Sequence, residues 1–75
     1  MASHADWRTR IVCDPRIHHG EPVVRGTRIA VSVLVGSLTD LSVEQLLEQY
    51  PQLTRADVEA AIRYAAEAAQ NTLVA

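Results

Sequence analysis

Arg25 and Arg28 are the residues whose type and spacing best suit the binding of an anionic partner. They lie within residues 20–29, where two Gly and one Pro indicate a backbone that turns. A guanidinium group makes bidentate contacts to phosphate or carboxylate, so this turn predicts binding more than catalysis. The alternative is structural, because either arginine could pair with an acid (Asp14, Glu21 or Glu48) and hold the turn against the helices.

The last predicted helix carries a second group of charged residues. Arg55 and Arg63 are candidate contacts to DNA phosphates or to a guanine edge. Asp57 and Glu59 would repel the same phosphates, and Glu59, Arg63 and Glu67 form an i, i+4, i+8 ladder typical of a self-paired surface. We therefore expect this helix to be a weak DNA reader by itself.

The same helix is apolar beyond one face, which makes it a candidate surface for another protein chain. Ala60, Tyr64 and Ala68 form a row at i, i+4 spacing whose small side chains would allow close approach, and the apolar Leu73 and Val74 follow. The alternative is that the row packs in the core, with alanines chosen for helix propensity.

No group of residues predicts catalysis or a bound cofactor. The serines stand in helix-start or helix contexts, and the spacing of Cys13, His18 and His19 matches no standard zinc pattern. We expect neither enzymatic activity nor a metal site. A single cysteine excludes an internal disulfide and favours a reducing compartment.

Composition indicates one small domain. The chain has 75 residues, 48% of them hydrophobic but only three aromatic, which predicts an aliphatic core. Residues 1–35 carry five Arg and three acidic residues, whereas residues 36–75 carry two Arg and six acidic residues. An anionic ligand is therefore expected on the N-terminal half. There is no signal-peptide pattern and no apolar run of about 18 residues, so we expect a soluble cytoplasmic protein.

Extended segments are predicted first and helices afterwards. Residues 7–13 alternate between two faces, and residues 22–25 and 27–29 are further extended candidates. Strand pairing within one chain or between two is left open by the pattern.

Three helical segments follow. Residues 31–38 have apolar side chains at i, i+3, i+4 and i+7, and residues 42–45 form a capping box before a helix that Pro51 stops. Residues 54–57 form a weaker capping box, which opens a long helix with one apolar face (Val58, Ala61, Ile62, Ala65 and Ala69). The short connection predicts either a helix-turn-helix or a generic three-helix bundle.

Three blocks of the sequence closely resemble one family. Residues 20–29 read GEPVVRGTRI, residues 42–54 read SVEQLLEQYPQLT and residues 60–67 read AAIRYAAE. Together they resemble the small bacterial family of domain of unknown function four-three-three, which includes antitoxins of the VapB type. The resemblance implies a mainly α fold, a three-helix homeodomain-like helix-turn-helix with a short N-terminal β element. It also implies a role in type II toxin–antitoxin modules, beside a toxin with a PIN-like ribonuclease fold.

The chain departs from the family pattern at two places. Residues 38–42 lack the Gly that the family usually carries, which predicts a tighter turn or an earlier end to the first helix. His19 stands where the family more often has Gly.

We divide the single domain, residues 1–75, into four parts: a loose N-terminus (1–9), a β element and turn (10–29), the helix-turn-helix (30–70) and a tail (71–75). The first functional hypothesis is a homodimeric antitoxin that binds a PIN-like toxin through Ala60, Tyr64, Ala68, Leu73 and Val74. Its contacts to operator DNA would come from Arg25, Arg28, Arg55 and Arg63. The alternative is a protein-interaction or dimerisation module without specific DNA binding, which the net acidic helical half favours.

Overall fold

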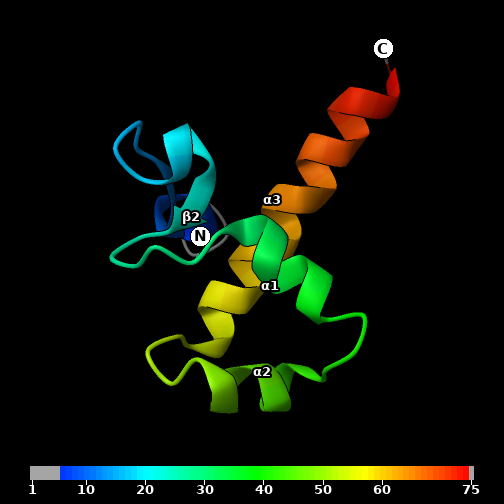
Figure 1. Cartoon of the computed structure of the whole chain (residues 1–75). Helices are drawn as coiled ribbons and strands as arrows, with labels where there is room; N and C mark the ends of the chain where they lie inside the picture. The colour runs from blue at the N-terminus through cyan, green and yellow to red at the C-terminus, as the bar shows by residue number, and fades with distance from the viewer. Residues whose placement is uncertain (1–5, 75) are drawn as a thin grey trace.

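The computed structural model describes the backbone of residues 6–74 and the side chains of residues 7–70. In that part the chain forms, in order, η2 (Asp6–Arg10), β1 (Ile11–Cys13), η3 (His18–Gly20), β2 (Pro22–Val24), α1 (Val31–Ser37), α2 (Val43–Gln49) and α3 (Arg55–Val74), where η denotes a 3-10 helix. In Figure 1, α1 lies beside α3, α2 lies at one end of the pair, and the β element lies to one side. The predicted fold class, mainly α with three helices and a short N-terminal β element, is confirmed.

The β element is a two-stranded antiparallel sheet. Ile11 pairs with Val24 and Cys13 pairs with Pro22. The predicted strand over residues 7–13 is therefore wrong in its first half, where residues 7–10 lie in η2. The reason is the length of the partner: β2 ends at Val24, so the register leaves the residues before Ile11 without a partner strand.

Of the predicted loose N-terminus, residues 6–9 belong to η2, which packs against α3, and residues 1–5 lie outside the described residues. The Nη2 atom of Arg8 lies 2.7 Å from Oε2 of Glu67, and the Arg8 guanidinium stacks 4.6 Å above the ring of Trp7. The third extended candidate, residues 27–29, forms no strand of its own. Its end pairs back on β2 through a single bridge between Val23 and Ala30.

Both predicted capping boxes form. At the start of α2, the Gln45 backbone N–H donates to Ser42 Oγ (3.1 Å) and the Ser42 N–H donates to the Gln45 side chain (2.9 Å). At the start of α3, Thr54 and Asp57 exchange the equivalent bonds at 3.2 and 2.9 Å. Each box satisfies two backbone donors that a helix start otherwise leaves unpaired.

The first helix is one residue shorter than the predicted segment 31–38. It stops at Ser37, and Leu38 is its C-cap residue. A run of short-range backbone bonds from residues 38–41 back to residues 35–37 then tightens the turn into α2.

The core lies where the helices meet β2. It consists of buried aliphatic side chains from β2, all three helices and the turn before α3: Val24, Val31, Leu34, Leu46, Leu53, Val58 and Ala61. Helix α3 continues through Val74, so most of the predicted tail is helical. Its C-terminal end lies farthest from the other elements in Figure 1. No helix within the described residues is long and apolar enough to cross a bilayer.

Candidate functional site: a groove beside Arg28

A groove opens between the loop after β2, the first turns of α1 and the end of α2. Its volume is about 400 Å³. Its lining includes both apolar and aromatic residues and polar or charged ones: Ile29, Ala30, Val33 and Tyr50 in the first group, His18, Glu21, Arg28 and Ser32 in the second. Val33 is 48% exposed. The groove therefore combines an accessible apolar side chain with charged residues.

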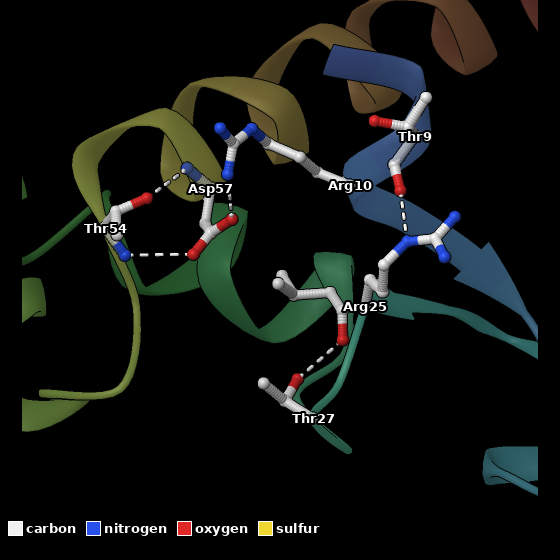
Figure 2. Close-up of polar contacts among 7 residues, drawn as sticks. Thr9, Arg10, Arg25, Thr27, Thr54 and Asp57 are labelled. Carbon is white, nitrogen blue, oxygen red and sulfur yellow. Dashed lines mark hydrogen bonds and ion pairs between the residues drawn. The ribbon is translucent and has the colours of Figure 1, made fainter. Parts of the chain in front are cut away.

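Hydrogen bonds to β2 fold the Arg28 loop into a fixed shape. The Val24 N–H donates to the Ile29 carbonyl (3.0 Å), and the Thr27 hydroxyl donates to the Val24 carbonyl (2.8 Å), as Figure 2 shows for Thr27. Thr27 Oγ1 also accepts the Ile29 N–H at 3.0 Å. Gly26 closes the turn with a φ of +80°, a conformation that residues with a side chain seldom adopt. Arg28 is thereby carried on a closed loop.

A left-handed turn in η3 also contributes to the groove. His18 and His19 have φ angles of 49° and 57°. Non-glycine residues seldom adopt positive φ, although His is among the more tolerant types. The Nε2 atom of His18 lies 2.8 Å from the Arg28 carbonyl oxygen, which joins this turn to the Arg28 loop.

Arg28 is an unpaired cation at the groove, since it has no ion pair among the described residues. Glu21 accepts a long 3.4 Å hydrogen bond from Ser32 instead. Asp14 binds Arg16 through both oxygens, and these bonds lower the pKa of Asp14 below its ordinary value, with a smaller contribution from the charge of Arg28. The structural alternative, in which Arg28 pairs with an acid, is not what the chain forms.

Arg25 points away from this groove toward the N-terminal elements. Its Nε donates to the Thr9 carbonyl oxygen at 2.5 Å (Figure 2). Its backbone N–H donates to the Arg10 carbonyl at 2.7 Å, one residue beyond the sheet. Arg25 therefore helps to hold η2 against β2, while its side chain stays exposed.

The other predicted DNA contacts, Arg55 and Arg63, differ from each other. The Nη2 atom of Arg55 lies 2.5 Å from Oε2 of Glu44 on α2, and this contact lowers the pKa of Glu44. Arg63 is exposed and has no ion pair within the described residues. The predicted ladder is wrong, because Glu67 pairs with Arg8 rather than with Arg63.

Asp57 does not face outward as the sequence predicted. Its Oδ1 lies 3.0 Å from Arg10 Nη1, and its Oδ2 accepts the Thr54 N–H (Figure 2). The Asp57 side chain is only 13% exposed. One of the two acids expected to repel DNA is thus turned inward and neutralised.

The predicted partner-binding row is not a continuous surface. Ala60 is fully buried, so its assignment to a partner surface is wrong, and the alternative of core packing holds for it. Tyr64 is half-buried and packs on the core, where burial first and the neighbouring Cys13 second raise the pKa of its hydroxyl. Ala68 is exposed. The side chains of Leu73 and Val74 lie outside the described residues.

For Ile62, the burial predicted from the sequence is wrong in the opposite direction. It was assigned to the buried face of the long helix, yet it is 41% exposed. Helix α3 packs on α1 and η2 through the face of Val58 and Ala61, and Ile62 lies at the margin of that face.

Sequence reasoning also missed most of the groove. Apart from Arg28, none of its lining residues was predicted to bind DNA or a partner protein. One feature of the sequence could have pointed to the groove. Val33 is apolar, yet it lies outside the i, i+3, i+4 face of the helix that begins at Val31. The contribution of Tyr50 could not be anticipated, because it depends on how α2 packs.

A second, smaller cavity of about 180 Å³ lies between η2 and α3. It is lined by Trp7, Arg8, Ile11, Tyr64 and Glu67. Across the described residues, no three His, Cys, Asp or Glu side chains gather closely enough to hold a metal ion.

The fold and the groove define a small, mainly helical domain of three helices with an N-terminal β element and an exposed groove at Arg28. Residues 11–65 match the family described as "Protein of unknown function (DUF433)", and the chain belongs to this family. No curated protein and no solved structure matches the chain.

Proposed function

We propose that this chain is the antitoxin of a type II toxin–antitoxin module, a cytoplasmic binding protein rather than an enzyme. Its protein partner is a ribonuclease toxin with a PIN-like fold, a class taken from the resemblance to VapB-type antitoxins. The observation that carries the proposal is the groove at Arg28. There an unpaired guanidinium stands beside the exposed Val33 and the half-buried Tyr50.

This combination suits a protein ligand. Arg and Tyr are the side chains that most often dominate the free energy of protein–protein binding. A partner segment with an apolar side chain next to a carboxylate would cover Val33 and pair with Arg28. Glu21 in the same groove selects against a second carboxylate close by, since like charges repel.

Operator DNA is the second ligand in this proposal, with Arg25, Arg28, Arg55 and Arg63 as its contacts. Support is uneven among the four. Arg28 and Arg63 have no ion pair among the described residues, whereas Arg55 must release Glu44 before it can meet a phosphate. A homodimer would double each weak contact.

The alternative, an interaction or dimerisation module without specific DNA binding, has an observation in its favour. The outward face of α3 presents Glu59 beside Arg63, and Glu44 neutralises Arg55 at the start of the helix. A recognition helix with two arginines and three acidic residues has no net positive charge and gains little from the phosphate backbone.

The decisive experiment is complex formation with the PIN-like protein encoded beside this chain. We expect co-purification, and calorimetry should show about tenfold weaker binding for Arg28→Ala and for Val33→Glu. Arg16→Ala is the matched control, because Arg16 is an exposed arginine that already pairs with Asp14. Failure of every adjacent PIN-like protein to bind would overturn the proposal.

Titration of the chain against its own promoter separates the two functions. A sequence-specific shift that weakens with salt supports operator binding. Binding that does not depend on the DNA sequence, or no binding to DNA, supports the interaction module. If the double variant Arg25→Ala/Arg28→Ala bound the promoter as well as the wild type, the assignment of these contacts would be wrong.

A further inference from the structure

The outward face of α3 carries an exposed apolar side chain beside two opposite charges. Ile62 is 41% exposed. Glu59 and Arg63 are four residues apart and lie on the same side of the helix, with Ile62 one turn after Glu59 and next to Arg63 in the sequence, and both charged residues are exposed. Among the described residues, neither Glu59 nor Arg63 takes part in an ion pair.

The other charged side chains of α3 are already paired inside the chain. Arg55 pairs with α2, while Asp57 and Glu67 pair with arginines of η2. The unpaired charges of the helix are therefore confined to the two residues beside Ile62, within the side chains that the structure describes. These two residues carry opposite charges. A second helix with the same two residues, running in the opposite direction, would therefore place its arginine opposite Glu59 and its glutamate opposite Arg63.

Two antiparallel copies of α3 supply that reversed order. A two-fold axis crossing the helix at the level of Ala61 brings Glu59 of one copy level with the partner's Arg63, and the symmetry repeats the pair. Under the same axis, the two Ile62 side chains lie within about 3 Å of each other along the helix direction, since each residue advances 1.5 Å. The contact is apolar at its centre and has an ion pair on each side.

We propose that this face, formed by Glu59, Ile62 and Arg63, is the homodimer interface, and that its occupant is α3 of a second copy of this chain. The proposal adds the contact surface to the homodimer of the proposed function. It is tested on the chain alone, without toxin or DNA, so its failure leaves the toxin complex untouched.

One consequence concerns DNA. A helix-turn-helix dimer that reads two half-sites holds its recognition helices about one DNA turn apart, roughly 34 Å. Helices packed face to face through Ile62 cannot reach two successive major grooves. In this dimer, operator contacts fall to Arg25 and Arg28 rather than to Arg63.

The first test is the mass of the chain in solution, measured by sedimentation equilibrium over a range of concentrations. Reducing buffer is required because Cys13 is exposed and could link two chains. We expect a species of twice the 8.2 kDa chain mass. The Ile62→Glu variant should dimerise at least about tenfold more weakly, while Val33→Glu, a matched change at an equally accessible apolar residue, should dimerise like the wild type.

Charge reversal provides a second test that does not depend on an apolar residue. Glu59→Arg alone and Arg63→Glu alone each place like charges opposite one another and should raise the dimer Kd about fivefold. The double variant Glu59→Arg/Arg63→Glu restores both pairs and should return the Kd to within about twofold of the wild type. Circular dichroism checks that each variant is folded.

Several results would overturn the inference. A wild type that stays monomeric at high concentration excludes the dimer, and loss of the dimer in Val33→Glu but not in Ile62→Glu moves the interface to the groove. Charge variants whose effects simply add, with no recovery in the double variant, show that Glu59 and Arg63 do not meet across the interface.

Discussion

The Arg10 guanidinium lies 3.0 Å from the Asp57 carboxylate, and this pair joins the N-terminal elements to the start of the longest helix (Figure 2). Asp57 already accepts the Thr54 N–H as part of the capping box. One largely buried carboxylate therefore both caps α3 and anchors η2. The arrangement removes a negative charge from the face of α3 that sequence alone would have placed outward.

Arg10→Ala should destabilise the fold by about 1 kcal/mol, because it leaves the Asp57 carboxylate largely buried without its cation. The partial exposure of Arg10 limits the effect, since solvent screens the pair. Urea denaturation followed by circular dichroism measures the change. Arg16→Ala removes an arginine from a more exposed pair and should change stability much less than Arg10→Ala does. Equal losses in the two variants would contradict the anchoring role of Asp57.

Alanine substitutions at Gly26 and Gly36 should have opposite effects on stability. A Cβ atom meets nothing within 4 Å at either position, so crowding does not decide the outcome. Gly26 has a φ of +80°, and alanine there should cost about 1 kcal/mol. Gly36 lies in α1 without positive φ, and alanine there should stabilise by roughly 0.5 kcal/mol through helix propensity. Thermal melting of the two variants checks the signs.

The Tyr64 hydroxyl should make stability fall at high pH. Burial, followed by the nearby Cys13, raises its pKa above the ordinary value of 10.0 in the folded chain. The unfolded chain therefore releases this proton at lower pH than the folded chain. Its contribution is complete below the unfolded pKa and is lost as pH rises through the folded pKa.

Denaturation curves from about pH 8 to about pH 11 measure this dependence. Tyr64→Phe should flatten the decline. A Cys13→Ser variant should reduce the decline in part, since Cys13 contributes less than burial. An unchanged decline in Tyr64→Phe would assign it to another group.

If the chain binds DNA, its arginines should contribute unequally to the salt dependence. Arg28→Ala should lower the slope of log affinity against log salt by about 1, the value for one lost phosphate contact. Arg55→Ala should change the slope less, because Glu44 already neutralises Arg55. Glu44→Gln leaves Arg55 without that partner and should strengthen binding. Mobility-shift titrations at several salt concentrations measure all three, and equal slopes for both alanine variants would contradict the ranking.

Local structure was readable from the sequence wherever neighbouring residues decide it. The capping boxes at Ser42 and Thr54 depend on residues three apart, and the structure confirms both. The stop at Pro51 has the same local cause, because proline cannot continue a helix. Family membership was also predictable, since residues 11–65 carry the matching blocks.

Tertiary structure alone decided which charged side chains form ion pairs with each other. The sequence offered Glu59 or Glu67 to Arg63 and several acids to Arg28, yet Glu67 pairs with Arg8 across 59 positions of the chain. Spacing within a helix gives the pairs that are geometrically open, but the packing of η2 on α3 selects which of them form. That packing also buried Ala60 and left Ile62 exposed.

The sequence by itself thus determined the helices, their caps and the turn around Gly26, because backbone conformation follows from residues close in the chain. Only the tertiary structure decided which charges remain available for a partner. Electrostatic pairing depends on distances between elements, and those distances exist only once β2, η2 and the three helices have packed around a common core.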